Sequence, residues 1–178
     1  MQLEGDLNPL TFSRNANEQV LVFGGIFSEY EPLSNWGKFP VKYGGEYYPT
    51  LEHGYMHRKC LINDDVRSAQ EVLDSSEAYM AKQIGDRVKI KKEKWNDQKS
   101  EVIMAQLLEA KFTPGSELAK VLLATGTKYL AESGRNQRYA CGLSITHRNI
   151  LDRTAHTGGN RLGHLIMERR QFLRQQST

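Results

Sequence analysis

The spacing of apolar residues along the chain changes between strand-like and helix-like patterns. Residues 19–27, QVLVFGGIF, form a continuous apolar run that predicts a buried strand. Residues 37–50, GKFPVKYGGEYYPT, predict a β-hairpin, because two aromatic and β-branched runs flank Gly44 and Gly45, which tolerate the positive φ of a tight turn. KYLAES, residues 128–133, predicts one more strand, so the chain contains the elements of a small sheet.

The pattern becomes helical after the hairpin. Thr50 suits an N-cap, because its hydroxyl accepts a free backbone N–H, and Pro49 stops the preceding strand. Asp64 and Asp65 can start a second helix whose apolar face lies in VRSAQEVL, residues 66–73. Two consecutive helices are therefore expected between residues 50 and 73.

The second half of the chain is mainly helical. WNDQKSEVIMAQLLEAKF, residues 95–112, is the longest predicted helix; its apolar stripe is Val102, Ile103, Leu107 and Ala110. Pro114 ends this helix, and a short helix follows at 117–124. GNRLGHLIMERRQFLRQ, residues 159–175, closes the chain as a helix; the side chains expected inside are Leu162, Leu165, Ile166 and Phe172.

These elements predict an α+β fold, a single compact and mainly helical domain around a small β-sheet. The 178 residues are enough for one domain with a good core and few for two. Residues 1–18 are expected to be a polar N-terminal lead-in, and residues 19–174 the folded domain.

Composition narrows the class of protein. Hydrophobic residues make up 39% and charged residues 25%, as in ordinary globular proteins, and no apolar run approaches the roughly 20 residues that span a bilayer. The start of the chain has no pattern of a secretory signal. Cys60 and Cys141 form no disulfide framework, so a reducing, cytoplasmic environment is expected. The net charge of +3 permits an anionic ligand without indicating nucleic acid by itself.

Residues 46–59, EYYPTLEHGYMHRK, concentrate the candidate chemistry. On a helix, His53, His57 and Cys60 share one stripe, and imidazole and thiolate are zinc ligands. The helix motif of zinc proteases needs a glutamate directly after its first histidine, where this chain has Gly54, and no second Cys/His cluster supplies a fourth ligand. No metal site is therefore expected.

The neighbouring stripe contains Glu52, Tyr55, Met56 and Lys59. Glu52 lies in the first turn, where the helix dipole favours the ionised carboxylate. Lys59 follows two turns later on the same face, too far for a local ion pair, so the two side chains can meet around a ligand. A solvated charged face is the alternative interpretation.

Five motifs occur in an order and spacing that resemble the NADAR family, whose members include the YbiA-like N-glycosidases. They are PLSNW at 32–36, YPTLEHGYMHRK at 48–59, KKEKWNDQKSEVIMAQLLEAKF at 91–112, LLATGTKYLAES at 122–133 and GGNRLGHLIME at 158–168. The resemblance extends from about residue 23 to residue 170. It implies a compact α+β catalytic domain with one cleft, no cofactor, and hydrolysis of an N-glycosidic bond on a ribose that carries phosphate.

The resemblance also implies the roles of individual residues. Glu52 matches the key carboxylate, which stabilises positive charge on the sugar or activates water. Lys59 matches the family lysine, which binds ribose or phosphate or acts as an amine nucleophile. The positions matching substrate-binding residues are Ser34, Asn35, Trp95, Asn136, Tyr139, Gly159 and Asn160.

Two of these assignments have a structural alternative. Trp95 can stack on the leaving base or anchor the start of the long helix. Gly159 and Asn160 open the last helix, where free N–H groups can bind a phosphate, although a plain N-cap by Asn160 explains them equally well.

The chain departs from the family pattern in GRNQRYACGL, residues 134–143. Aligned on Gly142, Asn136 replaces the common aspartate, Tyr139 the tryptophan and Ala140 the glycine. Asparagine keeps the shape of aspartate but cannot ionise, which raises the alternative of a non-catalytic sensor of ADP-ribose or a nucleotide. Asp152 is a candidate substitute whose location the sequence does not define.

The family contains two substrate classes: ADP-ribose attached to guanine of nucleic acid, and the phosphoribosylamino-pyrimidines of riboflavin synthesis. RVKIKKEKW, residues 87–95, has five cations in nine positions, which is typical of a solvated face and also suits phosphate contacts. This run favours ADP-ribosylated DNA or RNA as the substrate and partner, with the pyrimidine intermediates as the alternative. No membrane partner is expected, and the sequence indicates no protein partner.

Overall fold

The computed structural model describes residues 19–24 and 30–176 and confirms the α+β class. The predicted lead-in at 1–18 and part of the first predicted strand lie outside the described residues. The strands are β1 (Val20–Phe23), β2 (Val41–Tyr43), β3 (Glu46–Tyr48) and β4 (Tyr129–Glu132). The α-helices are α1 (Leu51–Ile62), α2 (Val66–Asp74), α3 (Ala78–Arg87), α4 (Asp97–Lys111), α5 (Glu117–Ala124) and α6 (Arg161–Gln176). Short 3₁₀ turns occur at Glu31–Leu33 and Arg153–Ala155.

The strands form two separate pairs within the described residues, where one small sheet was expected. β1 runs parallel to β4, with Val20 opposite Tyr129, and β2 and β3 form the predicted antiparallel hairpin. Gly44 and Gly45 make its turn with φ angles of 63° and 90°, as their position predicted. All four residues of β1 are buried, which explains its continuous apolar sequence.

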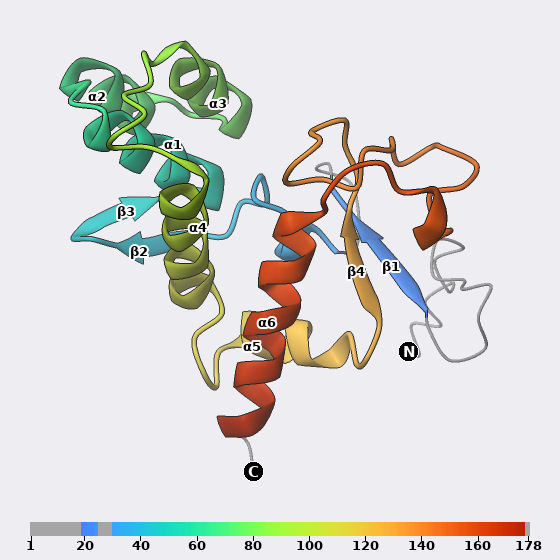
Figure 1. Cartoon of the computed structure of the whole chain (residues 1–178). Coiled ribbons are helices and arrows are strands. Elements are labelled where there is room, and N and C mark those ends of the chain that lie inside the picture. Colours follow the sequence, from blue (N-terminus) through green and yellow to red (C-terminus); the bar gives the residue numbers. More distant parts are fainter. Residues whose placement is uncertain (1–18, 25–29, 177–178) are drawn as a thin grey trace.

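The helices join these two strand pairs into one domain. Helices α1, α2 and α3 lie together beside the β2–β3 hairpin, while β1 and β4 occupy the opposite side, with α4 and α6 between them (Figure 1). α4 packs against α1 and β2, and α6 packs against α4 and β4. One large apolar cluster includes side chains from all six helices, and a smaller one lies between β1, β4 and the chain around residues 141–150.

Local capping signals placed the helix starts correctly. Thr50 accepts a hydrogen bond from the backbone N–H of His53 and begins α1, and Asp65 does the same for α2 through the N–H of Ser68. The predicted short helix at 117–124 coincides with α5. Side-chain oxygens that satisfy free N–H groups of the first turn are therefore reliable signals in this chain.

Other sequence expectations were wrong. Helix α3 was not predicted, because its start has no side-chain cap. Val102 and Phe172 were expected inside but are each 44% exposed. In α4 the buried face is Ser100, Ile103, Met104, Leu107, Leu108 and Lys111. In α6, Leu173 takes the buried position next to Phe172, which instead packs under the guanidinium of Arg169.

Within the described residues no helix is long and apolar enough to cross a membrane.

Asn160 ties the start of α6 to the end of β4. This side chain is 1% exposed, and its backbone has a positive φ of 47°. Its Oδ1 accepts a hydrogen bond from the N–H of Glu132 at 2.9 Å, while its Nδ2 donates to the carbonyl of Leu130 at 2.8 Å and to the hydroxyl of Tyr129 at 3.0 Å. One buried amide thus satisfies three polar groups at the strand end.

We expect Asn160→Ala to lower the free energy of unfolding by about 2–4 kcal/mol, because the N–H of Glu132 and the carbonyl of Leu130 would stay buried without partners. Urea denaturation followed by circular dichroism measures this change. Gln98→Ala, an exposed change on α4, is the control and should stay within about 0.5 kcal/mol of the parent. Equal stabilities for the two variants would contradict the structural role of Asn160.

Candidate active site

A cavity of about 300 Å³ lies between α1, α3, α4, the end of β4 and three loops. All four residues of the second α1 stripe, Glu52, Tyr55, Met56 and Lys59, line it. Helical periodicity therefore brings the carboxylate and the lysine to one cavity, as their shared face on α1 allowed.

Glu52 is the most buried charged group of the cavity. It is 5% exposed, and its backbone N–H donates to the carbonyl of Asn35 at 3.0 Å. Burial raises the pKa of Glu52 to about 7, although Lys82, Lys59 and a hydrogen bond from the Asn35 side chain favour the ionised form. The position in the first turn of α1 favours the ionised carboxylate, but desolvation outweighs that effect.

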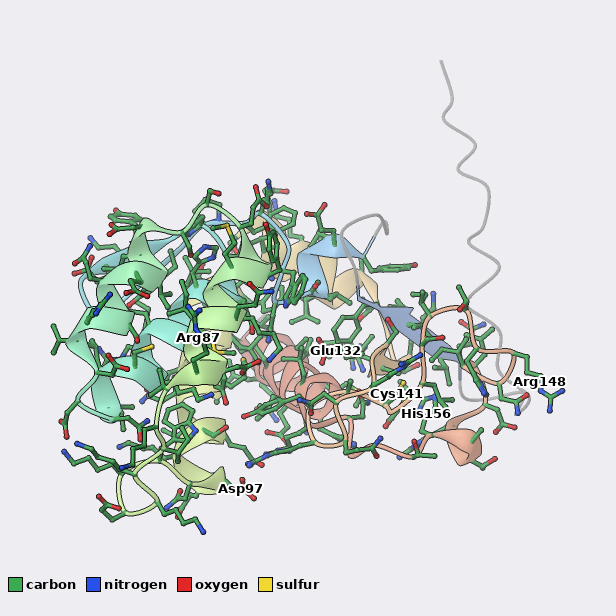
Figure 2. The ribbon with its side chains drawn as sticks, turned by 90° about the horizontal axis from the view of Figure 1, so that it is seen from above. Arg87, Asp97, Glu132, Cys141, Arg148 and His156 are labelled. Atoms are coloured by element: carbon green, nitrogen blue, oxygen red, sulfur yellow. The ribbon has the colours of Figure 1, made fainter. Side chains whose placement is uncertain are left out.

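Glu132 is a second carboxyl group of the cavity, and the sequence did not indicate it. It ends β4 and lies near the centre of the molecule, between the helical half and the β1–β4 half (Figure 2). Burial, and then the negative charge of Glu52, raise the pKa of Glu132 to about 8. At neutral pH Glu132 is therefore mostly protonated while Glu52 is close to its pKa, so one group can donate a proton and the other can accept one, as acid–base catalysis requires.

Two lysines and one aspartate form the cationic wall. The Nζ atoms of Lys59 and Lys82 lie 3.8 Å and 3.0 Å from the carboxylate of Asp86. Burial lowers the pKa of Lys59, an effect that Asp86 opposes. Because two ammonium groups share one carboxylate, this wall carries a net positive charge and suits an anionic ligand.

Aromatic rings and hydroxyl groups form another part of the cavity wall. The ring of Tyr55 packs edge-on against Trp95 and Tyr139, with centroids 5.6 Å and 5.9 Å away. Its hydroxyl lies 2.6 Å from Oγ of Ser100, which in turn lies 2.5 Å from the hydroxyl of Tyr139. Trp95 is buried just before α4, whose N-cap is Asn96, so it lines the cavity and anchors the helix start at once.

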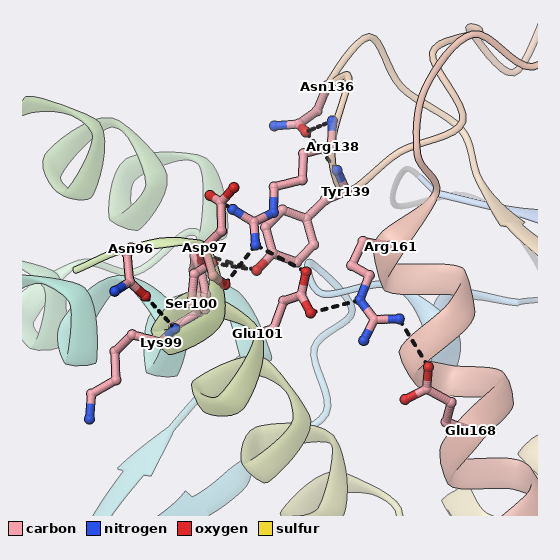
Figure 3. Close-up of polar contacts among 11 residues, drawn as sticks. Asn96, Asp97, Lys99, Ser100, Glu101, Asn136, Arg138, Tyr139, Arg161 and Glu168 are labelled. Atoms are coloured by element: carbon pink, nitrogen blue, oxygen red, sulfur yellow. Dashed lines mark hydrogen bonds and ion pairs between the residues drawn. The ribbon is translucent and has the colours of Figure 1, made fainter. Parts of the chain in front are cut away.

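The loop after β4 closes the cavity by a network of ion pairs (Figure 3). Arg138 pairs with Asp97 and, at 3.0 Å, with Glu101 in the first turns of α4. Glu101 also accepts from Arg161 of α6 at 3.0 Å, so one carboxylate connects the loop to both helices. Asn136 shapes the loop, since its Oδ1 accepts from the N–H groups of Arg138 and Tyr139 at 2.9 Å and 2.8 Å.

The structure brings most of the predicted site residues together. The predicted residues that line the cavity are Asn35, Glu52, Lys59, Trp95, Asn136 and Tyr139. Ser34 lies behind the wall: its Oγ accepts from the N–H of Trp36 at 3.1 Å, and its carbonyl accepts from Lys111 at 2.8 Å.

Gly159 and Asn160 do not form the predicted anion site. Their N–H groups donate to the carbonyls of Gln137 and Ala140, at 2.8 Å and 3.0 Å, and the next two amides of α6 are also bonded to this loop. The backbone N–H groups at the start of α6 are therefore already hydrogen-bonded to carbonyls of residues 137–140. Asp152 does not line the cavity either, and its carboxylate caps the turn at Arg153–Ala155.

The two histidines of the first α1 stripe, His53 and His57, make hydrogen bonds inside the folded domain. The ring nitrogens of His53 contact Oγ1 of Thr50 at 2.8 Å and the carbonyl of Ser75 at 3.1 Å, and Nδ1 of His57 contacts the hydroxyl of Tyr48 at 2.8 Å. Among residues 19–24 and 30–176, no group of three or more His, Cys, Asp or Glu side chains could hold a metal ion.

Paired carboxyl groups with raised pKa values beside cations and aromatic rings define a cleft of the kind that acid–base enzymes use. The chain belongs to the NADAR family: the NADAR domain matches residues 17–174. It is 32% identical to N-glycosidase YbiA of Escherichia coli (strain K12) over 157 residues, which cover 88% of this chain and 89% of the relative. With N-glycosidase YbiA of Shigella boydii serotype 4 the identity is 31% over the same shares. The fold matches the NMR structure of E. coli YbiA with a TM-score of 0.71 and 30% identity, covering 89% of this chain and 86% of that one.

We expect carbon-13 NMR of the glutamate carboxyl groups to resolve two that titrate near pH 7 and 8, because burial disfavours both charged forms. Glu52→Gln should lower the pKa of Glu132, since the variant removes a neighbouring negative charge. A pKa of Glu132 that stays unchanged in this variant would show that the two groups are not coupled.

The same shifts predict how stability depends on pH. Between about pH 4.5 and 8 these two carboxyl groups hold protons in the native state that they have released in the unfolded chain, so their contribution to stability falls as the pH rises through this window. Glu132→Gln should weaken this dependence in urea denaturation at pH 5, 6.5 and 8.

Proposed function

We propose that this protein is an N-glycosidase that hydrolyses the bond between ADP-ribose and a modified nucleobase, a guanine of DNA or RNA. The observation that carries the proposal is the pair of carboxyl groups, Glu52 and Glu132, facing one cavity beside Lys59 and Lys82. Membership of the NADAR family and relatives named N-glycosidases support a glycosidase as the general class of enzyme.

The two carboxyl groups have different roles in the proposed reaction. As the bond between C1 of the ribose and the base nitrogen breaks, positive charge builds on the sugar ring, and the Glu52 carboxylate stabilises it. Glu132 gives its proton to the departing nitrogen. Water forms the new bond to C1 and passes a proton to Glu52, and exchange with solvent then restores both groups.

The other walls of the cavity bind the rest of the substrate. Lys59 and Lys82 contact the ribose or a phosphate, where a ligand anion replaces part of their interaction with Asp86. Trp95 and Tyr139 offer ring faces to the leaving base.

The basic segment at residues 87–95 favours nucleic acid as the carrier of the modified base. It connects Asp86 to Trp95, two residues that line the cavity, so it borders the cavity at both of its ends. Lys91 and Lys94 pair with Asp64, whereas the exposed Arg87, Lys89 and Lys92 make no ion pair within the described residues. Three unpaired cations at this position suit a phosphate backbone.

Hydrolysis of phosphoribosylamino-pyrimidines is the second candidate. The cavity volume of about 300 Å³ lies at the small end of ligand sites and suits one sugar with one ring better than a whole ADP-ribose. With ADP-ribose, the adenosine part would extend out of the cavity.

Incubation with ADP-ribosylated guanine DNA should release free ADP-ribose, and Glu52→Gln should slow this release at least about 100-fold, because the charge on the sugar would lose its stabilising carboxylate. Chromatography of the products measures it. Glu117→Gln, an exposed change on α5, is the matched control and should keep full activity.

Other outcomes reject this substrate. Release of ribose 5-phosphate from the pyrimidine intermediates, with none from modified DNA, would select the second candidate. Tight binding of ADP-ribose without turnover of either substrate would indicate a non-catalytic sensor.

The double variant Lys89→Ala/Lys92→Ala should raise the KM for modified DNA several-fold, since it removes two phosphate contacts. The slope of log KM against the logarithm of the salt concentration should also fall by about two. Steady-state kinetics at two or more salt concentrations measures both effects. Lys120→Ala/Lys128→Ala, the same change of charge near α5, is the control. Equal effects of the two double variants would contradict a specific nucleic-acid surface beside the cavity.

A further inference from the structure

The guanidinium of Arg138 lies at the boundary between the cavity and solvent. Arg138 lines the cavity, and its Cζ lies 5.4 Å from the centre of the Tyr139 ring, which also lines the cavity. Its ion-pair partner Asp97 does not line the cavity and has a side chain that is 90% exposed. Because the side chain of Arg138 is itself 29% exposed, a ligand that extends out of the cavity can reach it.

The contacts of Arg138 include one exchangeable partner (Figure 3). Its Nη2 donates to the backbone carbonyl of Asp97 at 2.6 Å and to the carboxylate of Glu101 at 3.0 Å. Glu101 is also held by Arg161, whereas the Asp97 carboxylate makes no other ion pair within the described residues. An ion pair with so exposed a carboxylate contributes little to stability, so an incoming anion can replace it.

We propose that Arg138 binds a phosphate in the part of the substrate that extends out of the cavity, in exchange for the carboxylate of Asp97. The assignment rests on the proposed function, in which Glu52 faces C1 of the ribose and the adenosine part of ADP-ribose lies outside the cavity. A planar guanidinium matches the oxygens of a phosphate group, and Nε of Arg138 makes no hydrogen bond within the described residues.

This contact distinguishes a diphosphate from a single phosphate. The cations of the cavity come from separate elements, Lys59 and Lys82 from α1 and α3, and Arg138 from the loop after β4. The two lysines suffice for a ligand with one phosphate, and a diphosphate presents a further phosphate group to Arg138. Arg138 therefore favours ADP-ribose over ribose 5-phosphate, the sugar phosphate that the second candidate reaction releases.

The test measures the binding of ADP-ribose and of ribose 5-phosphate to the full chain by isothermal titration calorimetry. Arg138→Gln should weaken the binding of ADP-ribose about 10-fold or more, because a charge-assisted contact with phosphate is lost. The affinity for ribose 5-phosphate should change less than about twofold. Arg67→Gln, which removes an exposed arginine of α2 that pairs with Glu71 at 3.0 Å, is the matched control and should change neither affinity.

Asp97→Asn separates a phosphate contact from a merely structural role of Arg138. This variant should bind ADP-ribose about two- to fivefold more tightly, because the competing charge is lost. The backbone carbonyl of residue 97 and the Glu101 carboxylate still accept from Arg138, so the loop stays attached to α4. In the Arg138→Gln background the same change should have no effect, which excludes a general effect of charge. Glu71→Gln on α2 is the matched control.

Weaker binding of ADP-ribose in both Arg138→Gln and Asp97→Asn would show a purely structural role and overturn the assignment. Equal losses for the two ligands in Arg138→Gln, or no binding of ADP-ribose by the parent, would overturn it as well. These results are distinguishable from a failure of the proposed function. Turnover of modified DNA with an unchanged affinity for ADP-ribose in Arg138→Gln would reject the role of Arg138 alone. Binding that depends on Arg138, without turnover, would support that role and reject the proposed reaction.

Discussion

The buried junction between β4 and α6 is the constraint on which the cavity depends. Polar backbone groups at the end of β4 are removed from water, and the side chain of Asn160 satisfies them. Carbonyl groups of the loop between the two elements accept hydrogen bonds from the first N–H groups of α6, which would otherwise lack partners. These requirements fix where β4 ends, and its last residue, Glu132, thereby faces the cavity.

Electrostatics inside the cavity follow from burial more than from local helix position. Glu52 lies at the favourable end of α1, yet desolvation raises its pKa to about 7, and its charge helps to raise that of Glu132. The nearby lysines are only partly neutralised by Asp86. The site therefore combines a group that can accept a proton, a group that can donate one, and a surplus of positive charge that suits an anion.

Asn136 and Tyr139, which the resemblance implies to replace an aspartate and a tryptophan, both make hydrogen bonds that support the structure. The amide oxygen of Asn136 holds the turn that places Arg138 and Tyr139, a task that needs an acceptor and no ionisation. The hydroxyl of Tyr139, which a tryptophan would lack, joins Ser100 and Tyr55 across the cavity wall. Asn136 and Tyr139 thus both stabilise the loop that lines the cavity.

Residue patterns alone predicted the features that depend on near neighbours in the chain. The Gly44–Gly45 turn, the Thr50 cap and the shared face of Glu52 and Lys59 follow from local backbone geometry and helical period. Packing between distant segments places Glu132 beside that face, occupies the amides at the start of α6 and leaves Phe172 exposed. No local pattern specifies this packing, and the burial that sets the pKa of Glu52 depends on it.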